Sequence, residues 1–247
     1  MPTINTVNNQ FFNNLSVTTA VAGATAAVTL SNADNTDAAS HAKTLSLTGG
    51  ASAGDAYVHF TNGVVNWTMG VDNSDADALV ISYSDTPGTT NVARCSVDGE
   101  WTYPLQPGFN AFKDASASNV TGTATLYKPV HNQERFDRNA DYSTATGNFT
   151  APVTGKYLLT GSANIGGGTA MTTTDLLIVT TAKTYYSGRR AGASLVSQMV
   201  NHAVIADMTA ADTAYLQVRS YTEASNTDDY YGAAGTSYNH FTGTLLQ

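Results

Sequence analysis

The sequence predicts an all-β protein, and three observations support that fold class. Short runs of β-branched and aromatic residues recur along the 247-residue chain, and clusters of Gly, Asn, Asp and Ser separate them. Helix signals are nearly absent. Hydrophobic residues make up 42% of the chain and charged residues 12%, a composition too apolar for a disordered chain. We expect an extended N-terminal arm over residues 1–40, a small antiparallel β domain over 41–106 and a C-terminal jelly-roll sandwich over 107–247.

The expected arm is small, polar and without a lasting hydrophobic period, and its stretch SNADNTDAAS is typical of a loop. A free arm of this composition would be disordered, so we expect a partner or a neighbouring subunit to hold it. No basic region precedes its apolar stretch, so we expect no secretory signal and synthesis in a cytoplasm. The run AVAGATAAV is too short and too weakly apolar to cross a bilayer.

The expected small domain begins with the alternating run KTLSLTG, and the runs DAYVHF, VVNWTMGV, ALVISYS and VARCSV follow at short intervals. The Asn62-Gly63 pair predicts a hairpin whose two central residues have positive φ. The Asp98-Gly99 pair predicts a second turn. Few bulky apolar residues face any one side, so we expect this thin domain to need partner chains to bury its core.

Pro104 and Pro107 mark the expected domain boundary, because proline cannot donate to a β ladder. Alternating runs at regular spacing then predict a sandwich or jelly roll. The expected strands are 108–115, 123–130, 134–137, 147–152, 155–165, 174–181, 183–188, 194–208, 214–221 and 240–247.

The stretch FDRNADYSTATGNFTAPVTGKY at 136–157 spaces four aromatic residues around a Gly, an Ala-Pro and a second Gly. With an earlier aromatic strand and a final Phe-x-Gly and leucine-rich strand, this order resembles the globular head of complement subcomponent one-q and its tumour necrosis factor-like relatives. The matching residues are Phe112, Phe136, Asp137, Tyr142, Gly147, Phe149, Ala151, Pro152, Gly155, Tyr157, Asp212, Phe241, Gly243, Leu245 and Leu246.

The resemblance covers about 108–247 and implies a ten-stranded jelly roll that assembles as a tight homotrimer. It also implies a protein that binds proteins or surfaces and is not an enzyme. The residues that it assigns to the core or to the trimer interface are Phe112, Phe136, Tyr142, Phe149, Tyr157 and Phe241.

The N-terminal half is similar to modules of phage structural proteins, in which a Gly-Asp strand, a Trp strand and an Ile-Ser strand recur beside fibre shafts. The stretch GDAYVHFTNGVVNWTMGVDNSDADALVISYS carries this resemblance. Its matching residues are Trp67, Gly70, Asp72, Asn73, Ser74, Asp75, Asp77, Ile81 and Ser82.

Charge and composition exclude several function classes. The net charge is −8 and no basic run occurs, so we expect neither nucleic-acid binding nor membrane insertion. Cys95 is the one cysteine and predicts a buried small hydrophobe. The five histidines have no ligand spacing, and the acidic loop DNSDAD favours an Asx-rich turn over a Ca²⁺ site. We expect no metal and no cofactor.

Two Tyr-rich stretches, YYSGRRAG and TDDYYGAAGTSY, combine tyrosine with charge. Tyr and Arg are enriched at binding hot spots, so Arg189, Arg190, Tyr230 and Tyr231 are candidate ligand contacts. The alternative is that each Tyr pair lies on an edge strand, with one ring facing in and one facing out.

The sequence thus predicts a virion structural protein of a tailed phage, made in the host cytoplasm and displayed on the virion surface. It would be a capsid decoration protein or short head-fibre trimer that docks on the major capsid protein, or another virion protein, through residues 1–106. The alternative is a tail-fibre tip that recognises a glycan or protein receptor on the host surface. A polysaccharide-cleaving enzyme would need two carboxylates across a cleft, and no Asp lies in such a motif.

Overall fold

The computed structural model describes residues 54–235 and 238–246, and over 189–195 it describes the backbone alone. Within these residues every regular element is a strand, apart from one short 3-10 helix, which confirms the all-β class. No described helix is long and apolar enough to cross a membrane. The predicted arm and the predicted run KTLSLTG lie outside the described residues.

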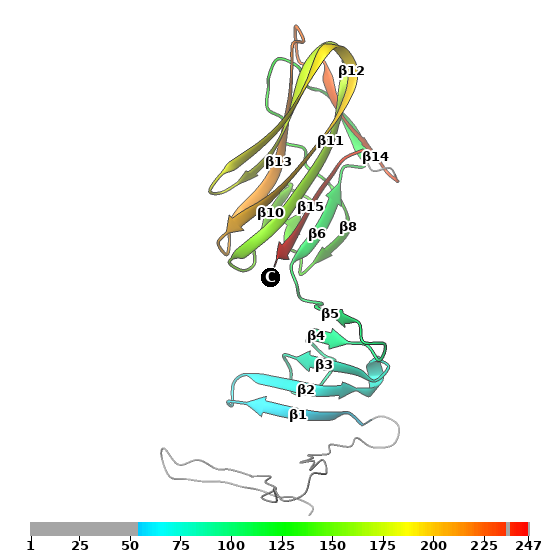
Figure 1. Cartoon of the computed structure of the whole chain (residues 1–247), viewed down its shortest axis with the longest axis vertical. Coiled ribbons are helices and arrows are strands. Elements are labelled where there is room, and N and C mark those ends of the chain that lie inside the picture. Colours follow the sequence, from blue (N-terminus) through cyan, green and yellow to red (C-terminus); the bar gives the residue numbers. More distant parts are fainter. Residues whose placement is uncertain (1–53, 236–237, 247) are drawn as a thin grey trace, which may run out of the picture. The chain divides into compact units, whose positions relative to one another are not determined.

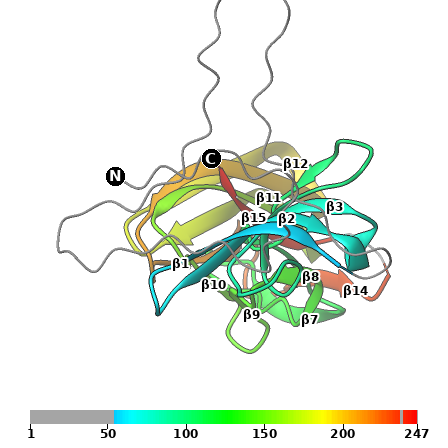
Figure 2. The ribbon, with the colours of Figure 1, turned by 90° about the horizontal axis from the view of Figure 1, so that it is seen from below.

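A five-stranded antiparallel meander forms the first sheet, with its strands in sequence order (Figure 1). Figure 2 shows its first three strands side by side. Between the second and third strands lies the 3-10 helix η1 (Asn73–Asp75). The strands are β1 (Ala56–Thr61), β2 (Asn66–Asp72), β3 (Ala78–Ser82), β4 (Asn91–Cys95) and β5 (Trp101–Thr102).

The hairpin predicted at Asn62-Gly63 joins β1 to β2, but its geometry differs from the prediction. Of the two residues, only Gly63 has a positive φ, at +88°. The Asn62 side chain instead accepts backbone hydrogen bonds from Val64 (3.0 Å) and Val65 (2.8 Å). The amide closes a longer loop, so the tight two-residue turn is not needed.

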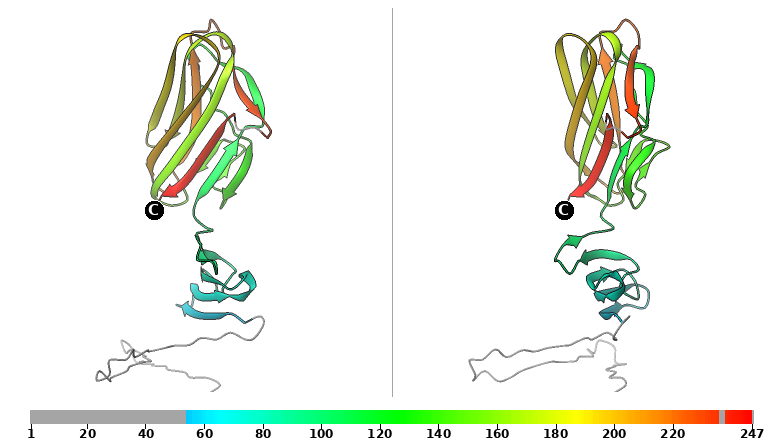
Figure 3. Two further views of the ribbon diagram at one scale, coloured as in Figure 1. Left: turned by 45° about the vertical axis from the view of Figure 1, so that its right-hand side comes forward. Right: turned by 90° about the vertical axis from the view of Figure 1, so that its right-hand side faces the viewer.

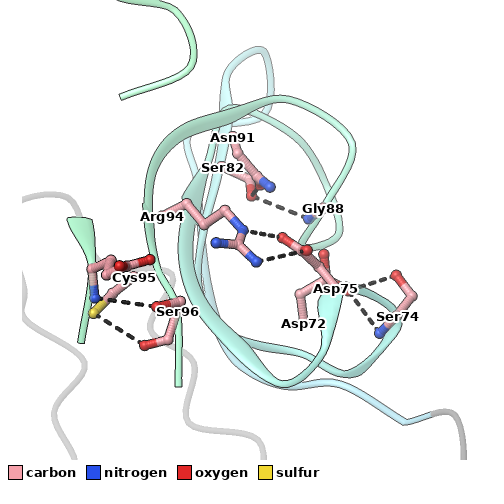
Figure 4. Close-up of polar contacts among 10 residues, drawn as sticks. Asp72, Ser74, Asp75, Ser82, Gly88, Asn91, Arg94, Cys95 and Ser96 are labelled. Carbon is pink, nitrogen blue, oxygen red and sulfur yellow. Dashed lines mark hydrogen bonds and ion pairs between the residues drawn. The ribbon is translucent and has the colours of Figure 1, made fainter. Parts of the chain in front are cut away.

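The chain itself covers one face of this sheet. Val80 is fully buried on that face, and the backbone N–H of Gly88, in the loop after β3, donates to the Ser82 hydroxyl (3.3 Å). Arg94 makes two hydrogen bonds to Asp75 of η1, one of them 2.9 Å long (Figure 4). The hydrogen bond from Arg94 lowers the pKa of the Asp75 carboxyl.

The second sheet contains ten strands that fold into two facing layers (Figures 1 and 3). Its bounds are β6 (Gly108–Phe112), β7 (Ala115–Thr121), β8 (Gln133–Arg138), β9 (Tyr142–Ser143), β10 (Asn148–Thr150), β11 (Gly155–Thr180), β12 (Thr184–Met208), β13 (Thr213–Tyr221), β14 (Asp228–Ala233) and β15 (His240–Leu246).

The strands β11 and β12 form one long antiparallel ribbon that belongs to both layers (Figure 3). The first part of β11 pairs with β15, which continues to β6 and β8; we call this the front layer. The second part pairs with β13, which continues to β10 and β9; we call this the back layer.

The ribbon differs from the prediction, which divided each of its strands in two. Register shifts occur between Gly166 and Met171 and between Met171 and Thr173. Such irregularities let a ribbon bend from one layer to the other without losing its pairing. Gly167 has φ +99°, a conformation that glycine adopts without strain. The Gly-rich run therefore bends a strand, where a loop was expected.

Four further elements differ from the prediction. The run 123–130 is not a strand and keeps one bridge, from Tyr127 to Val218. The strands β7, β9 and β14 were not predicted. Strand β14 pairs with both β7 and β11, and β9 pairs with β10.

Aromatic rings fill the space between the layers. Phe109 of β6 lies against Phe149 (4.8 Å between ring centroids), Tyr142 (5.0 Å) and Phe241 (5.0 Å). Phe149 also contacts Tyr157, at 5.4 Å. All five side chains are at most 5% exposed. This cluster is the centre of the core.

Candidate binding and assembly surfaces

The aromatic residues singled out in the sequence divide into two groups. Tyr142, Phe149, Tyr157 and Phe241 lie in the core described above. Phe136 of β8 is half exposed and opposes Asn110 of β6 across the sheet. Phe112 is partly buried at the end of β6, where the Arg135 guanidinium lies 5.1 Å from its ring centroid. Phe109, which the sequence interpretation missed, holds the central place on β6.

The outer face of the front layer carries exposed apolar side chains. Tyr157, Leu159 and Ala206 point into the core, so their neighbours Leu158 and Ile205 point outward, where they oppose each other across β11 and β12. The Ile205 side chain is 58% exposed. We call this outer surface of the front layer the assembly face. Its members include Asn110, Phe136, Leu158, Thr160, Met199, Ile205 and Thr242.

Two polar atoms on the assembly face lack partners. Asn110 and Thr242 oppose each other on β6 and β15. The Asn110 Oδ1 and Thr242 Oγ1 atoms are both buried, and within the described residues neither has a hydrogen-bond partner. A buried polar atom without a partner costs about 1–3 kcal/mol. Both atoms are shielded from solvent within one protomer, so this cost belongs to the fold of the domain itself.

The outer face of the back layer carries a network of tyrosine and charge. Asp175 Oδ2 accepts hydrogen bonds from Arg219 Nε and from the Tyr221 hydroxyl, both at 2.9 Å. The Arg219 guanidinium lies 5.1 Å from the Tyr221 ring centroid and 5.8 Å from that of Tyr186, which is 61% exposed. We call Asp175, Tyr186, Arg219 and Tyr221 the tyrosine face.

The ion pair of the tyrosine face is partly buried. The side chains of Asp175 and Arg219 are only 16% and 27% exposed. Partial burial, and then the hydrogen bond to Asp175, raise the pKa of Tyr221, so its hydroxyl keeps its proton and donates at neutral pH. Beside Asp175 and Tyr221 lies a hollow of about 260 Å³ whose other lining residues are Thr172, Thr173 and Thr222.

Glycine keeps one carboxylate oxygen of the network open. Gly188 opposes Asp175 across the ribbon, and a Cβ at Gly188 would lie 2.7 Å from Asp175 Oδ1. With glycine there, that oxygen can accept a hydrogen bond from a bound molecule. The surface thus offers an acceptor, hydroxyl groups and an exposed ring within one small area.

The predicted ligand contacts are not brought together. The assignment of Tyr230 as a ligand contact is wrong, because the side chain is fully buried and its hydroxyl lies 2.9 Å from His131 Nε2 in the core. Tyr231 follows it on β14 and is partly exposed, so the alternative of one ring in and one ring out describes this pair. Arg189 and Arg190 lie in β12, but their side chains are outside the described residues. The residue that sequence reasoning missed is Tyr186, although it belongs to the same Tyr-rich stretch as these arginines.

The acidic loop DNSDAD forms a capped turn. Asp72 accepts from the backbone N–H and the hydroxyl of Ser74, at 3.0 and 2.6 Å. Asp75 pairs with Arg94, and Asn73 donates to Asp77 (3.0 Å). These side chains have partners within the turn and the sheet. Across the described part of the chain, no group of three or more His, Cys, Asp or Glu side chains is placed to hold a metal ion.

Comparison with known proteins identifies the second sheet. The family model of the C1q domain matches residues 111–246. The chain belongs to the C1q domain family. The resemblance found at 108–247 is thereby confirmed, and the two-layered sheet is the C1q jelly roll. No curated protein matches the chain.

Two solved structures resemble the C1q domain of this chain. The globular domain of the zebrafish complement 1qA protein is 18% identical, with a TM-score of 0.40; the match covers 57% of this chain and 98% of that one. Murine APRIL is 11% identical, with a TM-score of 0.42, and the match covers 57% of this chain and 99% of that one.

Proposed function

We propose that the protein is a non-catalytic homotrimer that assembles through the assembly face of its C1q domain. The observation that carries this proposal is the pair Leu158 and Ile205, two aliphatic side chains that oppose each other on the outer side of the front layer. A monomer gains nothing from exposing them, whereas burial stabilises by roughly 25 cal/mol per Å² of apolar surface.

An aromatic side chain of the same face fits this assembly. Phe136 of β8 is half exposed there and is of the kind enriched at interfaces. Permanent assemblies of this type bury roughly 2,000–5,000 Å² in total.

The proposed setting is the virion of a tailed phage, as a capsid decoration protein or short head fibre. The resemblance inferred from the sequence of residues 54–84 supports it, as does the chain's composition, rich in small and polar residues. Residues 1–106 would dock on the major capsid protein or another virion protein. Three tethered arms would bind at high effective concentration, so weak individual contacts suffice.

Immunogold electron microscopy tests this setting, with the chain as antigen and particles from its source as the sample. We expect gold over the heads. Gold confined to the tail tips would contradict a position on the head and would indicate a tail-fibre tip that recognises the host. Intact particles that carry no gold, while the same antibody detects the chain in a lysate, would contradict a virion role.

The tyrosine face favours a second candidate, a receptor-binding protein that recognises a host surface glycan. Its one Arg and one Asp neutralise each other, which suits an uncharged polyhydroxylated ligand. The exposed Tyr186 ring offers a flat apolar surface for a sugar ring, and the open oxygen of Asp175 offers an acceptor for its hydroxyl groups.

Host adsorption by particles carrying Tyr186→Ala or Arg219→Gln tests this candidate. We expect adsorption to fall while particle stability stays unchanged, and alanine at Arg189, Arg190 or Tyr231 extends the test to the predicted loops. The control is Tyr238→Ala, which removes an exposed ring outside the tyrosine face. Equal adsorption by the variants and the control would count against glycan recognition here.

A further inference from the structure

The first sheet has a second face that its own chain does not cover within the described residues. Along β2, Thr68, Gly70 and Asp72 are buried, whereas the alternate residues Trp67 and Met69 are 38% and 45% exposed. Neighbouring strands continue this pattern on the same side. We call the set the apolar face; its members are Val58, Phe60, Trp67, Met69, Val71, Leu79, Ile81, Tyr83 and Cys95.

The apolar face is unusual for the surface of a monomer. Phe60 is 55% exposed and Leu79 41%, while Trp67 lies against Tyr83 with ring centroids 5.2 Å apart. None of the residues that make up the face is charged. A contiguous apolar area of this kind marks an interaction site.

The opposite face of the sheet is already packed. Val80 is fully buried there, and Arg94 is held by Asp75 (Figure 4). Arg94 and its neighbour Cys95 point to opposite sides of β4, so the cysteine belongs to the apolar face (Figure 4). Within the described residues, the sheet therefore has one packed face and one face without a cover.

We propose that the apolar face packs against the same face of two other copies of this chain, so that three small sheets close around a three-fold axis. The inference rests on the proposed trimer. Residues 103–107 join β5 to β6, so trimeric heads would hold three small sheets within a short tether of one another. Identical uncharged faces bring no repulsion into such a contact.

The chain's own N-terminal segment is a poorer occupant. Residues 1–53 are dominated by Thr, Ala, Asn and Ser, and eight of them are Met, Ile, Leu or Phe. Small polar side chains cannot fill a surface built of Trp, Phe, Met and Leu to the density of a protein interior. Three copies of the face supply large side chains to one another.

Cys95, the one cysteine of the chain, is a native reporter for this packing. It opposes Leu79 across the sheet and so lies on the apolar face. A short trifunctional maleimide can join three thiols only where three copies bring them together. The full-length chain would be treated with it, and the products separated on a denaturing gel. The matched control is Cys95→Ser combined with His59→Cys, because His59 is exposed and opposes Thr68 on the packed side.

The result expected is a covalent trimer from Cys95 at roughly tenfold the yield from the control, because the apolar faces meet and the opposite sides do not. Sedimentation of the untreated chain tests the trimer of the C1q domain separately from the packing of the small sheets. A trimeric mass without a covalent trimer from reacted Cys95 would overturn the small-sheet packing and leave the trimeric head intact. A monomeric mass would overturn both.

If the Cys95 thiol does not react in the native protein, the melting temperature of the Met69→Asp variant tests the small-sheet packing instead. Three carboxylates placed within a closed apolar contact would lower the thermal stability of the trimer, whereas Thr61→Asp on the exposed end of β1 would not. Equal melting temperatures for the two variants would contradict the inference.

Discussion

Phe109 of the front layer stacks on Phe149 of the back layer, with ring centroids 4.8 Å apart and ring planes inclined by 18°. The contact joins the two layers at the centre of the core, and the Phe149 side chain is 1% exposed. Phe149, one of the four aromatic residues of the stretch 136–157, thus joins the two layers.

Replacement of Phe149 by Ala should therefore lower the free energy of unfolding by about 3–5 kcal/mol, because it leaves a cavity between the layers. Urea unfolding of the variant and the parent chain measures the difference. Tyr186→Ala, which removes an exposed ring from the same domain, should change stability far less. Equal losses for the two variants would mean that the core is assigned wrongly.

Burial of His131 predicts an acid-sensitive fold. The side chain is fully buried beside Tyr230, and burial lowers its pKa from 6.5 to about 3. Because the unfolded chain binds a proton on this ring between those two pH values, stability falls as the pH drops below 6.5. The loss should reach about 2 kcal/mol at pH 5.

Urea unfolding of the parent chain and of His131→Gln at pH 7 and pH 5 checks this expectation. The variant should lose less stability between the two pH values than the parent, whatever its stability at pH 7. Some slope should remain, since burial also lowers the pKa values of His202 and His240. An unchanged slope would contradict the assignment of the effect to His131.

Gly243, in the Phe-x-Gly motif of the last strand, makes room for the central ring. A Cβ at this position would lie 2.5 Å from Phe109 Cε1 and 2.9 Å from Leu159 Cδ2. Gly243→Ala should therefore cost roughly 1–3 kcal/mol through overpacking. Gly108→Ala is the matched control, because its Cβ would meet nothing closer than 3.6 Å. Thermal melting of both variants would show a loss for Gly243→Ala alone, and a loss of the same size at Gly108 would refute the steric explanation.

The sequence predicted the aromatic core through motif spacing, and it missed features that depend on which side of a strand a residue faces. Phe112 was assigned from its place in the motif, yet on β6 the alternation turns Phe109 inward. A shift of one residue exchanges the two faces of a strand. Tyr230 was misplaced for the same reason, since β14 was not predicted and its inward positions were unknown.

The candidate surfaces were less accessible to sequence reasoning than the core. The tyrosine face joins Asp175 and Tyr186 of the long ribbon to Arg219 of β13, and their pairing depends on the register of three strands. The ribbon could not be predicted, because a Gly-rich run is typical of a loop, whereas here it bends a continuous strand. Long-range register has no signature in local composition.

The most direct test of the proposed assembly is sedimentation equilibrium of the full-length chain beside its Ile205→Glu variant. Ile205 lies on the assembly face opposite Leu158. Glu at this position would bury a carboxylate against an aliphatic side chain in the assembled trimer, which is unfavourable. We predict that the parent chain sediments at three times its 25.8 kDa mass and that the variant dissociates toward the monomer. A parent chain that stays monomeric at micromolar concentration, or a variant that remains fully trimeric, would contradict the account.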